Sequence, residues 1–157
     1  MVGNGIFSSK LSNLIQVWGG THDYLIRALQ VTQNKAMRHI TGRSWYTPSG
    51  VLLRKCNWMS VKQLIAYHSI ITVHRTVANK FPAYIHHKIN TETHHNTRNT
   101  VKYGDNFKGK TERTQSSFCY RGVVLYNKVP LEITQMQNIE TFKGKFKRWI
   151  KMNISIA

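Results

Sequence analysis

Positively charged side chains dominate the groups that this chain offers to a ligand. Its 157 residues include 23 Lys and Arg against 6 Asp and Glu, so that the formal net charge is +17. An excess of this size favours a polyanionic partner, most often nucleic acid, although basic proteins also bind anionic membranes. Repeated phosphate contacts hold a nucleic acid without reading its sequence. The ten predicted phosphate-contacting residues are Arg27, Lys35, Arg38, Arg43, Arg98, Lys143, Lys145, Lys147, Arg148 and Lys151.

These ten residues fall into two helical clusters and one loop position. Arg27, Lys35 and Arg38, with Arg43 just beyond, share one side of the first long helix that the periodicity predicts. This side is either a phosphate-contacting face or the ordinary solvated exterior of a surface helix. The five cations at positions 143–151 are denser, and their density favours the binding of RNA or of phosphate groups.

Two aromatic residues and one loop arginine need interpretations of their own. Phe146 and Trp149 interleave with the carboxyl-terminal cations but fit a helical apolar stripe, so we expect them to face the core rather than to stack on bases. Arg98 lies in the polar sequence HHNTRN, where an Asn-Thr turn is expected to hold it. It either grips a phosphate or docks against a carboxylate of the core.

Histidine pairs invite a search for a metal site. Zinc sites usually combine Cys and His at set spacings and close to four ligands, whereas the pairs at 86–87 and 94–95 have no Cys nearby. His68 and His74 lie on a predicted helix, and we expect packed or surface residues there instead of ligands. No Ser, Cys and His set supports a catalytic triad, and no glycine-rich motif cradles a phosphate. The chain is therefore predicted to be no enzyme, with no metal and no cofactor.

A helix over residues 21–42, THDYLIRALQVTQNKAMRHITG, must position the first cluster of cations. Thr21 or Asp23 is expected to cap its amino end, and Gly42 suits the left-handed residue past its carboxyl end. Residues three or four apart form its predicted apolar stripe. The members of this stripe are Leu25, Leu29, Thr32, Ala36 and Ile40.

Further helices are predicted along the middle of the chain. A short helix after Thr47-Pro48 precedes a longer one over residues 60–80, which Ser60 caps and Phe81-Pro82 ends. The β-branched residues 70–73 leave a strand as the alternative within it. A short helical turn then closes this part of the chain.

Two more helices are predicted after a long polar stretch. The sequence from Ser116 fits a helix that stops before Pro130, with Phe118, Val124 and Leu125 inward. Asn138 is expected to cap the final helix. The apolar face of that final helix consists of Ile139, Phe142, Phe146, Trp149 and Ile150.

These elements predict an all-α protein, a small helical bundle with a long polar loop and a carboxyl-terminal helical hairpin. No run of 18 apolar residues occurs and the amino end is a poor signal peptide, so we expect no membrane. The isolated Cys56 and Cys119 are expected to be buried thiols of a reducing, intracellular compartment, nuclear or cytoplasmic. The predicted segments are a remnant of a preceding region (1–20), a helical core (21–90), a polar linker (91–115) and a carboxyl-terminal helical segment (116–157).

Four sequence blocks follow one another in a characteristic order. VWGG at 17–20 is followed by LQVTQNKAMRHITG. The second block is a leucine-rich helix pair, Leu52-Leu53 and then Leu64–Val77, and the third is HHNTRN at 94–99. The fourth block runs from Gly122 through YNKVP to FKGKFKRWI. In this order the chain resembles the carboxyl-terminal region of reverse transcriptases from non-LTR retrotransposons of the jockey and CR1-like kind.

The resemblance implies the thumb of such a polymerase and the region after it, which grip template and primer. Polymerase palms hold two Mg²⁺ ions with paired Asp residues, but Asp23 and Asp105 each lack an acidic neighbour here. The implied partners are RNA or an RNA–DNA hybrid, and the rest of a polymerase. The alternative is a structural or protein-interaction module derived from a transposon, part of a larger assembly, which docks through exposed apolar residues such as Trp18.

Overall fold

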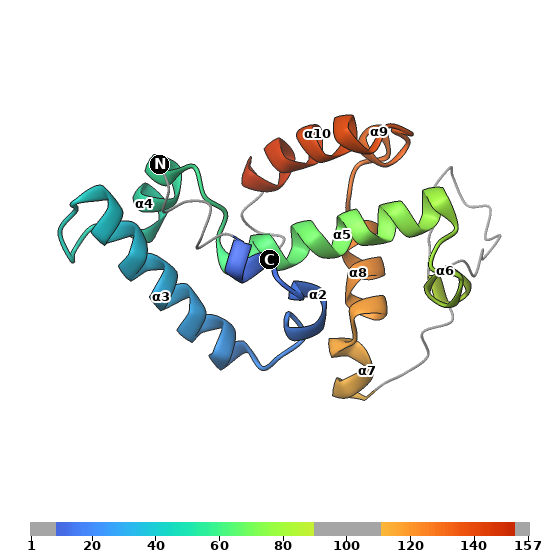
Figure 1. Ribbon diagram of the computed structural model, residues 1–157, viewed down its shortest axis with the longest axis horizontal. Coiled ribbons are helices and arrows are strands. Elements are labelled where there is room, and N and C mark those ends of the chain that lie inside the picture. The colour runs from blue at the N-terminus through green and yellow to red at the C-terminus, as the bar shows by residue number, and fades with distance from the viewer. Residues whose placement is uncertain (1–8, 90–110, 153–157) are drawn as a thin grey trace. The chain divides into compact units, whose positions relative to one another are not determined.

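The computed structural model describes residues 9–89 and 111–152, and no strand occurs within these two ranges (Figure 1). The prediction of an all-α protein is therefore confirmed. The described residues form two compact units, residues 9–65 and residues 66–152, called here the amino-terminal and the carboxyl-terminal unit. No helix in the described ranges has the length and apolar character needed to cross a membrane. The segment boundaries inferred from the sequence remain predictions, and most of the polar linker lies outside the described residues.

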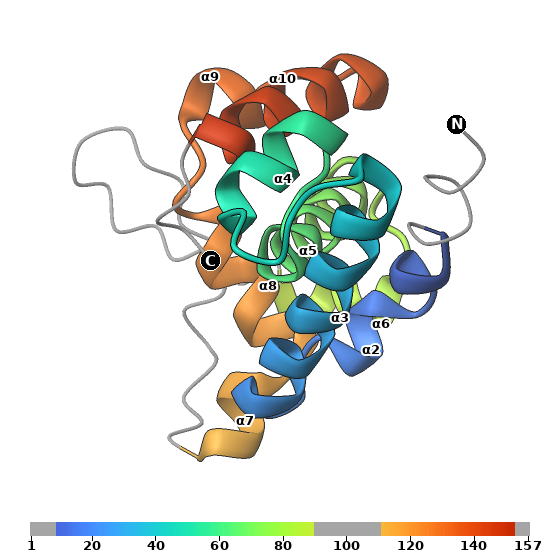
Figure 2. The same ribbon diagram turned by 90° about the vertical axis from the view of Figure 1, so that its left-hand side faces the viewer.

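The amino-terminal unit contains α2 (Ile15–Trp18), α3 (Asp23–Thr41) and α4 (Ser49–Cys56). Gly42 ends α3 with a left-handed φ of 61°, and its N–H and that of Arg43 both donate to the Arg38 carbonyl, as predicted. The chain then reverses through residues 43–48, and α4 packs against α3 (Figure 2).

The buried face of α3 differs from the predicted stripe by one position along the helix. Ile26, Gln33 and Met37 are buried, whereas Leu25 and Ile40 are 41% and 42% exposed. The predicted stripe was wrong because it left out the polar Gln33, which is buried. The side-chain amide of Gln33 donates from Nε2 to the Met59 carbonyl at 2.8 Å, so this buried polar group is satisfied.

Neither residue predicted to cap the amino end of α3 does so. The helix begins at Asp23 after His22, which makes no side-chain capping bond. The Asp23 carboxylate binds Arg27 at 2.8 Å and Lys62 at 2.9 Å instead. The hydrogen bond from Lys62 is the main reason why the pKa of Asp23 lies below its usual value. Two cations thus compete successfully with the backbone amides for this carboxylate.

Helix α5 (Val61–Asn79) is helical throughout, so the alternative of a strand at residues 70–73 was wrong. The predicted cap at Ser60 is confirmed as a capping box. The Gln63 backbone N–H donates to Ser60 Oγ at 3.2 Å, and the Ser60 N–H donates to Gln63 Oε1 at 3.1 Å. From residue 66 onward α5 belongs to the carboxyl-terminal unit, where Ile70 and Val73 are fully buried.

The carboxyl-terminal unit also contains α6 (Ala83–Ile89), α7 (Glu112–Ser116), α8 (Phe118–Tyr126), α9 (Leu131–Thr134) and α10 (Ile139–Met152). In α8 the buried residues are Gly122, Val123 and Tyr126, while Val124 is 40% exposed, so its predicted inward position was wrong. Helix α7 begins inside the segment predicted as a linker. Cys119, and Cys56 of the amino-terminal unit, were predicted to be buried, but both are half-buried free thiols. Burial raises the pKa of both thiols.

Helix α10 follows the sequence prediction closely. The Asn138 side chain accepts from the Glu140 N–H at 2.9 Å, which confirms the cap. Phe142, Phe146 and Ile150 are buried along one stripe, as their spacing predicted. Their burial fixes which positions of α10 remain for the cations.

Two glycines of the carboxyl-terminal unit should respond oppositely to substitution. A Cβ at Gly122 meets Val73 Cγ2 at 3.0 Å, whereas a Cβ at Gly144 meets nothing within 4 Å. Gly144→Ala should therefore raise the free energy of unfolding by about 1 kcal/mol through helix propensity. Gly122→Leu should lower it by about 1 to 3 kcal/mol through overpacking. Urea unfolding of both variants checks the pair, and a stabilised Gly122→Leu protein would contradict the packing.

His74 is a buried titratable residue in the same unit. Its Nδ1 lies 3.0 Å from the Tyr126 hydroxyl, and its ring stacks on Phe142 with a centroid separation of 3.8 Å. Burial lowers the pKa of His74, an effect that the nearby Met136 carbonyl partly offsets. Burial, with a smaller contribution from Arg75, also lowers the pKa of His68.

Acid should therefore destabilise the carboxyl-terminal unit. As the pH falls through the ordinary histidine pKa of about 6.5, His74 is protonated in the unfolded chain but stays neutral in the folded protein, because its folded-state pKa is lower. The contribution of His74 to the free energy of unfolding is therefore fully present above that pH and decreases below it. The free energy of unfolding changes by at most about 1.4 kcal/mol per pH unit for one titrating group. Urea unfolding at a series of pH values should show a smaller dependence of the unfolding free energy on pH in His74→Phe than in the unchanged protein. Equal dependence in the two proteins would contradict this role.

Candidate nucleic-acid interface

The amino-terminal unit has almost no acidic groups to neutralise its cations. Residues 9–65 contain eight Lys and Arg and a single acid, Asp23. Asp23 is already bound to Arg27 and Lys62. The remaining cations, for which this unit holds no carboxylate, are Lys10, Lys35, Arg38, Arg43, Arg54 and Lys55. Folding thus leaves a strongly positive surface on this unit.

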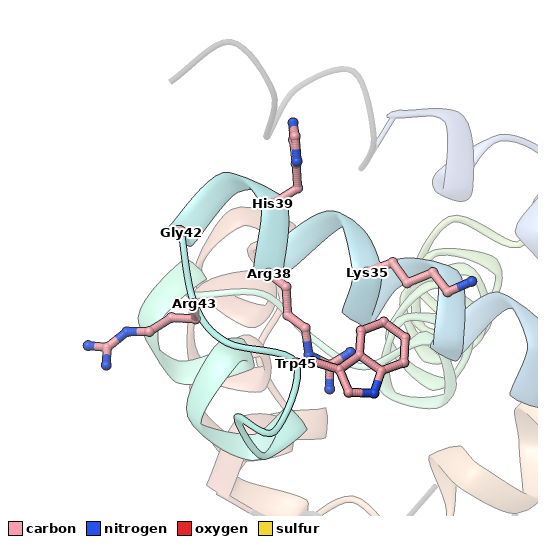
Figure 3. Close-up of a pocket in the computed structure, with 6 residues that line it drawn as sticks. All are labelled: Lys35, Arg38, His39, Gly42, Arg43 and Trp45. Carbon is pink, nitrogen blue, oxygen red and sulfur yellow. The ribbon is translucent and has the colours of Figure 1, made fainter.

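Half of those cations meet where α3 ends. An open pocket of about 350 Å³ is lined by Lys35, Arg38, His39, Gly42, Arg43 and Trp45 (Figure 3). The last turns of α3 supply the first three of these side chains, and the left-handed Gly42 redirects the chain so that Trp45 returns over Arg38. Arg38 and His39 lie in the last turn of α3, and the negative end of the helix dipole favours the guanidinium of Arg38 there.

Arg38 is the most constrained cation of this pocket. Its guanidinium carbon lies 5.0 Å from the centroid of the Trp45 ring, and Nη2 donates to the Thr47 carbonyl at 3.3 Å. The side chain is half-buried. These contacts give Arg38 a positioning role for the loop, in addition to any phosphate contact.

Lys35 and Arg43 are exposed on either side of that pair. In Figure 3 their side chains extend to opposite sides of the Arg38–Trp45 pair. Neither forms an ion pair within the described ranges. Both ammonium and guanidinium groups are thus presented to solvent, as a polyanion would require.

The cations of α10 form a second basic surface, in the carboxyl-terminal unit. The buried stripe divides them into two rows, because residues three or four apart share one side of a helix. One row contains Lys143, Lys147 and Lys151, and the other contains Lys145 and Arg148. Lys143 forms an ion pair with Glu140. The pKa of Lys151 is lowered, mainly by burial and to a smaller extent by repulsion from Lys147.

The structure therefore distinguishes among the ten residues predicted from the sequence. Lys35, Arg38 and Arg43 come together at one pocket. Arg27 and Lys143 have carboxylate partners, although the Arg27 side chain remains 78% exposed. Lys145, Lys147 and Arg148 are exposed, and Lys151 is half-buried. Arg98 lies outside the described residues.

Sequence reasoning missed the aromatic residues beside the pocket. Trp45 is 64% exposed and Tyr46 is 90% exposed. The available signal was the adjacent pair of large aromatics next to Arg43 in a segment without helical periodicity. Such residues lack a stripe that would bury them.

Metal-binding groups do not gather in the part of the chain that the structure describes. No cluster of three or more His, Cys, Asp or Glu side chains suitable for a metal ion occurs there. The His86 and His87 rings lie 6.3 Å apart, and the pair at 94–95 lies outside the described residues.

Comparison with known proteins gives no relative: no family model, no curated protein and no solved structure matches this chain.

Proposed function

We propose that the chain binds RNA or an RNA–DNA hybrid through phosphate contacts, with little dependence on base sequence. The observation that carries this proposal is the excess of positive charge in residues 9–65, which contain eight Lys and Arg but a single acidic residue. That residue, Asp23, is already paired with Arg27 and Lys62. Surfaces of this kind gain affinity by releasing counterions from a nucleic acid. The pocket at the end of α3 and the exposed cations of α10 are the two proposed contact regions.

The sequence resemblance suggests a setting for this activity. We propose that the chain serves as the non-catalytic carboxyl-terminal part of a reverse transcriptase of the non-LTR retrotransposon kind. A palm elsewhere in such an enzyme would supply the two-metal chemistry. In this setting the chain holds template and primer while another module polymerises.

A protein-interaction module is the second candidate, and one observation favours it. Leu14 and Val17, near the amino end of the described residues, are 66% and 76% exposed. Trp18, which the sequence suggested as a docking residue, is half-buried, and its Nε1 donates to the Asn13 carbonyl at 2.8 Å. Leu14 and Val17 are therefore better placed than Trp18 to contact a partner.

Two measurements separate these candidates. Fluorescence anisotropy with a short labelled RNA–DNA hybrid at low salt should show saturable binding, with similar affinity for hybrids of unrelated sequence. Size-exclusion chromatography with light scattering should show that the hybrid joins the complex. A stable oligomer that ignores the hybrid would support the interaction module and would overturn nucleic-acid binding. Preference for anionic vesicles over the hybrid would overturn it too.

A further inference from the structure

A tight turn presents two aromatic side chains beside the basic pocket. The Thr47 N–H donates to the Ser44 carbonyl at 3.1 Å, which closes a turn with Trp45 and Tyr46 at its two central positions. Central residues of such a turn lie at its outer corner. This position explains why two large aromatic residues remain 64% and 90% exposed in a folded unit.

The indole of Trp45 is held in place on one side. Arg38 lies over its ring, with 5.0 Å from the guanidinium carbon to the ring centroid. The bond from Arg38 Nη2 to the Thr47 carbonyl fixes the guanidinium to the far end of the same turn. The Trp45 ring is therefore held by Arg38 on one face and remains largely exposed to solvent, so that an aromatic ligand can stack on it.

Cations stand next to this ring. Lys35 and Arg43 line the same pocket and extend to opposite sides of the Arg38–Trp45 pair (Figure 3). A nucleotide strand places phosphates on both sides of each base along its backbone. The combination of an aromatic face with flanking cations is typical of proteins that bind single strands.

We infer that residues 35–46 bind an unpaired base of single-stranded nucleic acid, stacked on Trp45, with the adjoining phosphates at Lys35 and Arg43. This inference rests on the proposed function and adds a preference for unpaired over duplex strands at this pocket. In a duplex the faces of internal bases are already stacked on their neighbours. A duplex would therefore meet the cations of the pocket and leave Trp45 unused.

The test compares a labelled oligouridylate with a labelled RNA–DNA duplex of equal length. Trp45→Ala should weaken binding of the single strand about tenfold, within the range known for one stacked base. Its affinity for the duplex should stay within about twofold of the unchanged protein, because the phosphate contacts remain. Trp45→Phe should restore most of the single-strand affinity. Tyr84→Ala removes an equally exposed aromatic residue of α6 and should change neither affinity.

The outcomes separate this inference from the proposed function. If the unchanged protein binds neither strand form, nucleic-acid binding fails, and the stacking site fails with it. If it binds both forms while Trp45→Ala weakens neither, or weakens both equally, the stacking site alone is overturned. Circular dichroism of Trp45→Ala should match the unchanged protein, since the turn lies outside the core of its unit.

Discussion

Replacing Phe142 with alanine is expected to lower the free energy of unfolding by about 3 to 5 kcal/mol. Phe142 is fully buried, and its ring stacks on His74 at 3.8 Å and on Phe146 at 5.6 Å. The substitution removes a large apolar side chain and leaves a cavity between α5 and α10. Urea unfolding followed by circular dichroism measures the loss.

Thr141→Ala is the matched control for this experiment. Thr141 precedes Phe142 in α10 and is exposed, so its truncation should change stability by less than about 0.5 kcal/mol. A loss below about 1 kcal/mol in Phe142→Ala would mean that α10 does not pack as described.

Replacing both Lys35 and Arg43 with glutamine is expected to weaken binding of an RNA–DNA hybrid about 60-fold at 0.1 M salt. For each phosphate contact, the association constant varies with roughly the −0.9 power of the molar salt concentration. Each lost contact therefore reduces affinity about eightfold at about 0.1 M salt. Both side chains are exposed, so the fold should tolerate the change. Fluorescence anisotropy measures the two dissociation constants.

The control for this pair removes the same charge elsewhere. Lys80 and Lys88 are exposed and belong to neither proposed contact region, so Lys80→Gln with Lys88→Gln should reduce affinity only a few-fold. Equal losses in the two double variants would show that net charge alone, and not the pocket at the end of α3, determines binding.

Local signals in the sequence predicted the local structure well. The caps at Ser60 and Asn138 and the left-handed Gly42 depend on residues within three or four positions, and all three are confirmed. The stripe of α10 was equally readable because its apolar residues alternate cleanly with cations. These three helix ends and the strongly amphipathic face of α10 therefore follow from the sequence alone, whereas the amino end of α3 does not.

Long-range partners explain what the sequence could not predict. Gln33 is buried because the Met59 carbonyl, 26 residues later, accepts its amide proton. Gln30 similarly accepts from the Val61 N–H at 2.9 Å, 31 residues away. These two bonds favour the side of α3 that faces inward, and no pattern within the helix contains them.

Helix α9 was not predicted, because a helix of four residues is too short to show a periodic pattern of apolar residues.

The candidate site was predictable in its charge but not in its arrangement. The cations of α3 and the loop after it were predicted as one cluster, and three of the four, Lys35, Arg38 and Arg43, meet at one pocket, whereas Arg27 does not line it. The stacking of Arg38 on Trp45 depends on the turn after Gly42, whose course the sequence does not specify. Trp18, which was predicted to be exposed, is half-buried, and its indole N–H donates to a backbone carbonyl five residues earlier.

The dependence of hybrid affinity on salt tests the central claim most directly. If about six phosphates are neutralised, the logarithm of the association constant should fall with the logarithm of salt concentration with a slope of about −5. This slope corresponds to a roughly 1,000-fold loss of affinity between about 50 and 200 mM salt. A slope near zero, or no binding at the lowest salt, would contradict the account of this chain as a basic helical protein that holds a polyanion.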